Sequence, residues 1–109
     1  MSDGSIRIDK WLWFARMART RSLAARLCEA GFVTVGGAAA TKPHHPVRIG
    51  EAVTVVHGNV RRSLVVQQLG LRRGPPAEAR LLYDEPAPPT RLPRADPDWT
   101  PLLDEESLA

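Results

Sequence analysis

The fold is decided by residues 7–31, which read RIDKWLWFARMARTRSLAARLCEAG. Apolar residues recur in its first half with a helical period of about 3.6, which predicts a helix over residues 9–18. We expect Asp9 to cap this helix, because a carboxylate accepts hydrogen bonds from the free amides of a first turn. Arg16 and Arg19, three residues apart, are predicted to share the side opposite the apolar arc. That arc comprises Trp11, Trp13, Phe14, Ala15, Met17 and Ala18.

A second helix is predicted over residues 21–30. Thr20 is a favourable N-cap for it, and Gly31 suits the left-handed backbone position that ends a helix. Its apolar stripe contains Leu23, Ala24, Leu27, Cys28 and Ala30, while Ser22, Arg26 and Glu29 occupy the polar side. Two short helices in close succession form an αα-hairpin or a helix-turn-helix-like unit.

The hydrophobic period changes from helical to alternating after Gly31. Strands are predicted at residues 32–35, 51–57 and 61–69, and a last strand or edge segment at 79–83. Gly36-Gly37 and Gly58-Asn59 are predicted turns, and the prolines predict loops at 42–46 and 72–76. The order of elements, two helices followed by a small antiparallel or mixed sheet, predicts an α+β class.

The charge is divided unevenly along the chain. Residues 1–83 carry 13 Lys+Arg against five acids, whereas residues 84–109 carry two against seven. Six of the ten prolines also lie in the last 24 residues, where they disfavour helix and sheet. We therefore expect a flexible N-terminus (1–5), one basic domain (6–85) and an extended, Pro-rich acidic tail (86–109). Asp98-Trp99 and Leu102-Leu103 are expected to serve as a small anchor within that tail.

The composition excludes several classes of protein. With 109 residues and 43% hydrophobic residues, the chain suffices for one small folded domain. A single cysteine, Cys28, excludes an internal disulfide framework and is expected to be a small buried hydrophobe. No apolar run approaches the roughly 18 residues of a membrane span, and the N-terminus lacks a signal-peptide pattern. We therefore expect a cytoplasmic protein with no membrane association. We also expect it to be a monomer.

Basic residues are concentrated in the predicted helical unit. Six of the 20 residues from Arg7 to Arg26 are Lys or Arg, against the single acid Asp9. The start of the second helix adds unpaired amides and a partial positive charge, which favour a phosphate group. Guanidinium groups add forked, charge-assisted hydrogen bonds to phosphate. This pattern indicates binding to the phosphate backbone of a nucleic acid.

An ordered set of motifs accompanies this cluster. It consists of residues 7–16 (RIDKWLWFAR), Thr20-Arg21-Ser22, residues 31–37 (GFVTVGG) and Lys42-Pro43. Together these motifs resemble the RNA-binding domain named after ribosomal protein S4, over about residues 6–56. The remainder, through Leu82-Tyr83-Asp84-Glu85, is similar to a family of small ribosome-associated heat-shock proteins.

The resemblance implies a two-helix αα-hairpin packed on a small, mostly antiparallel sheet. It also implies structured RNA as ligand, most specifically ribosomal RNA of the large subunit. It further implies a role in rescue or recycling of stalled ribosomal complexes that carry nascent-chain tRNA, and possible contact with that tRNA. Two departures are the Gly36-Gly37 turn, where the family has Asn-Gly, and an acidic tail where the family often has a basic extension. The positions that match the RNA-facing residues of the family are Arg7, Lys10, Arg16, Arg19, Thr20, Arg21, Ser22, Arg26 and Lys42.

Other functions are less consistent with the sequence. A helix-turn-helix that reads DNA would need base-edge readers, but residues 21–30 contain neither Asn nor Gln. A protein-interaction module whose acidic tail masks the basic body is a further alternative. His44, His45 and His57 have no acid or Cys at ligand spacing, so we expect no metal and no other cofactor. The sequence also lacks the phosphate-loop, nucleophile-elbow and dinucleotide motifs, so we expect no enzymatic activity.

Overall fold

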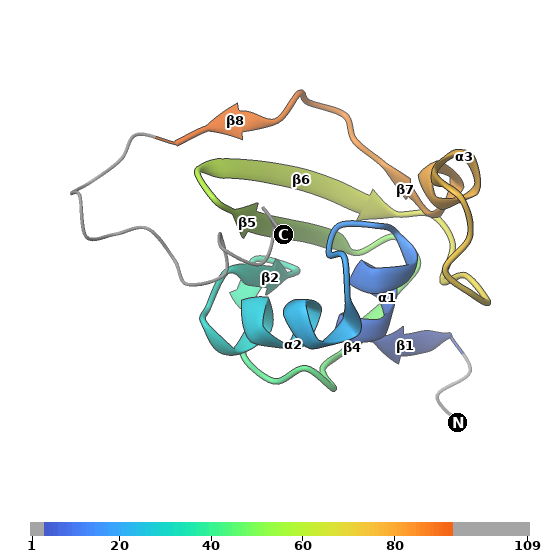
Figure 1. The fold of residues 1–109 in the computed structure, drawn as a ribbon, viewed down its shortest axis with the longest axis horizontal. Coiled ribbons are helices and arrows are strands. Elements are labelled where there is room, and N and C mark those ends of the chain that lie inside the picture. The colour runs from blue at the N-terminus through green and yellow to red at the C-terminus, as the bar shows by residue number, and fades with distance from the viewer. Residues whose placement is uncertain (1–3, 93–109) are drawn as a thin grey trace.

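The computed structural model describes residues 4–92 of the chain (Figure 1). Two short helices lie side by side against one face of an antiparallel sheet, which confirms the α+β class expected from the sequence. None of the helices within these residues is long and apolar enough to cross a bilayer. The elements are β1 (Ser5–Arg7), α1 (Ile8–Phe14), α2 (Arg21–Glu29), β2 (Val33–Val35), β3 (Ala38–Ala39), β4 (Pro46–Arg48), β5 (Ala52–His57), β6 (Val60–Val66), α3 (Pro76–Ala79), the 3₁₀-helix η1 (Arg80–Leu82), β7 (Tyr83–Asp84) and β8 (Thr90–Arg91).

The main sheet has the strand order β3-β2-β5-β6-β7, and β8 pairs with the start of β6. All its pairings are antiparallel, and the longest joins β5 to β6 through the predicted turn at Gly58-Asn59. Gly36 and Gly37 have φ of 62° and 86°, so both glycines adopt the left-handed conformation that a tight β2–β3 turn requires.

The core lies between the two helices and the sheet. Trp11 and Leu27 from the helices are fully buried, as are Val33 and Val53 from the strands. Removing this apolar surface from water is the main force that holds the layers together. The Trp11 indole Nε1 donates a hydrogen bond to the Gln68 carbonyl at 2.9 Å, which satisfies its polar atom inside the core and ties α1 to the segment after β6.

The first helix is shorter than predicted. It ends at Phe14, and Arg16 adopts a left-handed conformation with φ of 62°. The Arg16 amide donates to the Trp13 carbonyl and the Met17 amide to the Leu12 carbonyl, which is the hydrogen-bond pattern of a Schellman cap. The first helix was predicted correctly, but its predicted end at residue 18 was wrong. Met17 and Ala18 stay buried after the chain has turned, so apolar residues continue past the end of the helix.

One other segment differs from the predictions, and two short strands lie outside the predicted ones. The expected strand over 79–83 is mostly helical, since α3 and η1 occupy residues 76–82 and β7 begins only at Tyr83. Ser5 lies in β1, which pairs with β4 to form a second, two-stranded sheet. Thr90–Arg91, within the tail expected to be extended, pairs with β6. The anchor expected at Asp98-Trp99 and Leu102-Leu103 lies outside the described residues.

Candidate nucleic-acid interface

The start of α2 is capped as the sequence predicts. Thr20 has an extended backbone, and its Oγ1 accepts a hydrogen bond from the Leu23 amide at 3.0 Å. Arg21 and Ser22 form the first turn that follows, and both are exposed. The cap therefore fixes where the N-terminal end of α2, with its partial positive charge, meets the solvent.

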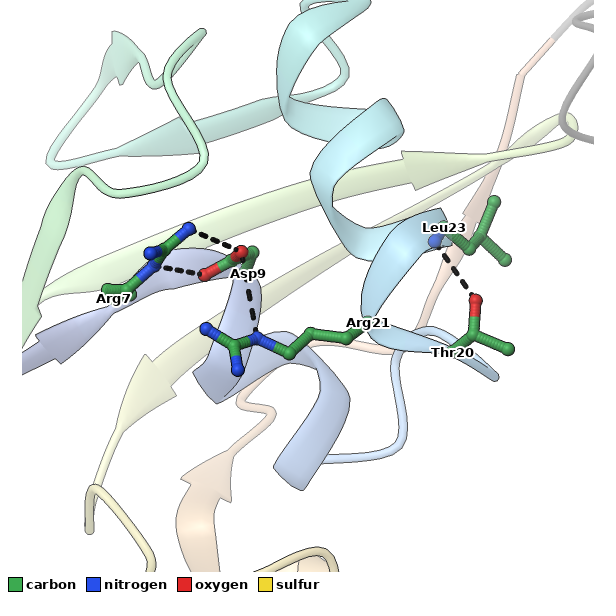
Figure 2. A network of polar contacts seen from close by, with 5 residues as sticks. All are labelled: Arg7, Asp9, Thr20, Arg21 and Leu23. Atoms are coloured by element: carbon green, nitrogen blue, oxygen red, sulfur yellow. Dashed lines mark hydrogen bonds and ion pairs between the residues drawn. The ribbon is translucent and has the colours of Figure 1, made fainter.

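Asp9 holds two of the predicted arginines together (Figure 2). Its side chain is only 5% exposed. Arg7 donates to both of its oxygens, through Nε to Oδ1 and Nη2 to Oδ2, each at 3.0 Å. Arg21 approaches the same carboxylate from α2, with 3.8 Å between its Nε and Oδ2. A single carboxylate thus links the end of β1 to the start of the second helix.

The expected cap at Asp9 was wrong. The N-cap position of α1 belongs to Arg7, and no side chain caps the helix there. The amides of Ile8 and Asp9 instead donate to the carbonyls of His45 and Pro43, at 2.8 and 3.2 Å. Because a distant loop supplies these acceptors, the Asp9 carboxylate is available to bind the two guanidinium groups.

The group around Asp9 keeps a positive charge, since one carboxylate faces two guanidinium groups. The side chains of Arg7 and Arg21 are 50% and 43% exposed, so each also meets the solvent. Lys42 is exposed in the loop that supports the start of α1, and its carbonyl accepts from the His45 amide at 2.9 Å. The structure therefore brings Arg7, Arg21 and the Lys42 loop to one region.

The remaining predicted residues surround the two helices. Lys10 is half-buried, with its Nζ 5.7 Å from the centroid of the Phe14 ring, so its stem covers apolar surface. Arg19 is exposed in the turn before the Thr20 cap. Ser22 and Arg26 lie one helical turn apart on the exposed side of α2.

Arg16 is not on a helix, and its side chain bonds to a different part of the chain from Arg7 and Arg21. Its Nε donates to the Gly74 carbonyl at 2.8 Å. The neighbouring Arg73 donates from Nε to the Trp13 carbonyl at 3.1 Å, and its guanidinium lies 5.9 Å from the centroid of the Trp13 ring. Burial, and secondarily the charge of Arg16, lowers the pKa of Arg73. Sequence reasoning could not place Arg73 here, because 55 to 60 residues separate it from the carbonyls that it contacts.

Two further expectations concern Cys28 and the histidines. Cys28 is fully buried on α2, as predicted. Burial raises the pKa of its thiol to about 12, assisted by the negative charges of Asp9 and Glu29, so this thiol is protonated at neutral pH. Within residues 4–92 no cluster of three or more His, Cys, Asp or Glu side chains could hold a metal ion.

Comparison with known proteins identifies the family to which the chain belongs. A model of the S4 domain matches residues 6–53. Heat shock protein 15 of Escherichia coli K12 is 40% identical over 82 residues, which cover 75% of this chain and 61% of that protein. Its homolog from Haemophilus influenzae is 38% identical over 78% of this chain and 64% of its own length. The chain thus spans a little over three fifths of these curated relatives.

A solved structure gives the same result in three dimensions. Heat shock protein 15 of Vibrio cholerae, whose structure is described as trimeric, is 38% identical and superimposes with a TM-score of 0.72. The match covers 76% of this chain and 83% of that one, so it includes most of the described fold. On the S4 match, the sequence identity and the shared fold, this chain belongs to the heat shock protein 15 family of S4-domain proteins.

Proposed function

We propose that the chain binds structured RNA and acts as a binding protein rather than an enzyme. One observation carries the proposal: Arg7 and Arg21 converge on Asp9 beside the start of α2, inside the region that matches the S4 domain. We call Arg7, Arg21, Ser22 and Lys42 the Asp9 group and assign RNA phosphates to it. Lys10, Arg19, Thr20 and Arg26, around the same two helices, extend that surface.

The chemistry of these residues suits a phosphate backbone. Guanidinium groups offer paired N–H donors to phosphate oxygens, and the capped end of α2 adds the partial charge of its amides. Duplex RNA has a deep, narrow major groove that side chains cannot read, so recognition depends on shape and phosphate position. The exposed residues of α2 include Arg21, Ser22 and Arg26, which suit phosphates better than base edges.

The proposed ligand is ribosomal RNA of the large subunit, in the cytoplasm. The proposed role is rescue or recycling of stalled ribosomal complexes that carry nascent-chain tRNA. We propose that the protein acts there as a monomer. Membership of the heat shock protein 15 family supports this choice of partner. Sedimentation of the full chain with purified ribosomal subunits, with and without peptidyl-tRNA, tests it. The proposal requires co-sedimentation with the large subunit, and loss of that association at high salt.

Substitution of single arginines tests the surface itself. Arg19→Ala and Arg21→Ala should each weaken binding to a ribosomal RNA fragment and reduce the slope of log affinity against log salt by about one unit. Arg61→Ala is the matched control, because Arg61 is exposed on β6 and alternates away from the core-facing Leu64 and Val66. Unchanged slopes in Arg19→Ala and Arg21→Ala would remove those residues from the interface. Preference for duplex DNA over structured RNA in competition would contradict the proposed ligand.

A further inference from the structure

The end of α1 holds two guanidinium groups through backbone carbonyls. Arg16 bonds to the Gly74 carbonyl, and Arg73 bonds to the Trp13 carbonyl at 3.1 Å and the Ala18 carbonyl at 3.5 Å. Arg7, Arg62 and Arg72 differ, because each of them bonds to a carboxylate. Among residues 4–92, the acceptors of Arg16 and Arg73 are therefore neutral carbonyls, which hold both side chains without neutralising their charge.

The backbone at Arg16 is strained for a residue with a side chain. It occupies the C′ position of the cap that ends α1, with φ of 62°. The equivalent position after α2 is Gly31, with φ of 84°, in the same pair of hydrogen bonds. A non-glycine residue in this conformation is energetically unfavourable, and such residues concentrate at functional sites. Arg16 thus places a guanidinium group at a position where glycine would be more favourable.

The two side chains also repel each other. Arg73 is half-buried against the Trp13 ring, and the charge of Arg16 contributes to lowering the pKa of its guanidinium. An anion that binds to both cations is attracted by each of them and offsets their mutual repulsion. Arg16 uses its Nε for a carbonyl, and Arg73 uses its Nε and, more weakly, its Nη2, so each guanidinium keeps further N–H donors that such an anion can accept from.

We infer that Arg16 and Arg73 form a second phosphate-binding site, separate from the Asp9 group. Its ligand is a phosphodiester group of the bound RNA, so the identity of the ligand rests on the proposed function. The Trp13 ring lies beside the Arg73 guanidinium, and the Gly74 carbonyl holds the Arg16 side chain by one hydrogen bond. The site thus joins the S4 region, through Arg16, to the loop before α3, which lies beyond the matched residues 6–53.

Arg16→Gly tests the site without endangering the fold, because glycine is the residue that favours a left-handed C′ position. Its melting temperature should equal or exceed that of the unsubstituted protein. Arg16→Gly and Arg73→Gln should each reduce the salt slope of binding to a ribosomal RNA fragment by about one unit and weaken affinity severalfold at low salt. Arg61→Gln, on the opposite face of the sheet, should leave the slope unchanged.

A second measurement is independent of RNA. Titration of the full chain with inorganic phosphate, followed by the NMR resonances of the arginine side chains, should shift Arg16 and Arg73 in a saturable way. Arg61 should shift only weakly and without saturation. The absence of a saturable shift at Arg16 and Arg73 would overturn the site.

The outcomes separate this inference from the proposed function. If Arg21→Ala lowers the salt slope while Arg16→Gly and Arg73→Gln do not, the second site is wrong and the Asp9 group stands. If phosphate shifts Arg16 and Arg73 but neither variant changes RNA binding, the ligand is a free phosphate compound and the assignment to RNA is wrong. If the unsubstituted chain binds no RNA, the proposed function fails, and the phosphate titration alone decides whether the site exists.

Discussion

At the scale of single residues, Asp9 shows how a buried charge organises an exposed cationic surface. Burying a carboxylate is unfavourable unless charged hydrogen bonds replace its water. Arg7 supplies two such bonds at 3.0 Å and Arg21 adds a third positive contact. The residue expected to cap a helix instead fixes the positions of two arginines from separate elements. Asp9 is therefore a positioning residue for the proposed interface.

Asp9→Asn should lower the free energy of unfolding by about 1–2 kcal/mol, because the amide keeps only one acceptor oxygen for Arg7 and loses the negative charge that attracts both guanidinium groups. Urea denaturation of the full chain measures this loss. Glu29→Gln is the matched control, since Glu29 is an exposed acid on α2, and its effect should stay within about 0.5 kcal/mol. Equal stability of Asp9→Asn and the unsubstituted chain would show that Asp9 does not organise the two arginines.

At the scale of elements, the Thr20 cap sets the start of α2 and hence the orientation of Arg21 and Ser22. Thr20→Ala should lower the free energy of unfolding by about 1 kcal/mol, because the Leu23 amide loses its acceptor. Thr20→Ser keeps the hydroxyl and should retain both stability and RNA affinity. Chemical denaturation and RNA titration of the two variants check this. If Thr20→Ser loses RNA affinity while remaining stable, the methyl group rather than the cap matters for binding.

The ion pair between Arg62 on β6 and Glu85, which follows β7, should make the stability of the protein sensitive to acid. Arg62 donates to both carboxylate oxygens of Glu85, at 3.0 and 2.7 Å, and this pairing lowers the pKa of Glu85 below its ordinary 4.5. A lowered pKa in the folded state means that the pair stabilises the protein above pH 4.5 and that this stabilisation is lost as the pH falls through the folded value. Glu85→Gln should flatten this part of the stability–pH curve measured by thermal denaturation. An identical acid-induced loss in both proteins would contradict the role of the pair.

Prediction from sequence succeeded where local chemistry decides the structure. Thr20, Gly31 and Gly36-Gly37 mark a cap, a helix end and a turn through properties of their own backbone or side chain. It failed where distant contacts decide. The bonds from α1 to the 43–45 loop displaced the cap from Asp9, and the position of Arg73 depends on packing against Trp13. The two arginine groups could therefore be predicted as basic, but not as separate sites.

At the scale of the whole molecule, the helical unit presents positive charge at two places. The Asp9 group lies where β1 meets the start of α2, and Arg16 with Arg73 lies where α1 ends. A ligand that contacts both must carry phosphates at more than one point, as a folded polynucleotide does. Such a distribution makes binding depend on the arrangement of phosphates in space as well as on their number.

The acidic residues after position 92 should oppose RNA binding through long-range electrostatics. Residues 93–109 contain five acids and one arginine, so a chain that ends at Leu92 rises in formal net charge from +3 to +7. The cut follows β8, because removal of Thr90–Arg91 would also remove a strand that pairs with β6. The shortened chain should bind a ribosomal RNA fragment more tightly at low salt, and the difference should shrink as salt screens the charges. Replacing the five acids by their amides in the full chain should increase RNA affinity to the same extent. If the shortened chain binds RNA more tightly but the amide variant does not, the charge of the acids is not the cause.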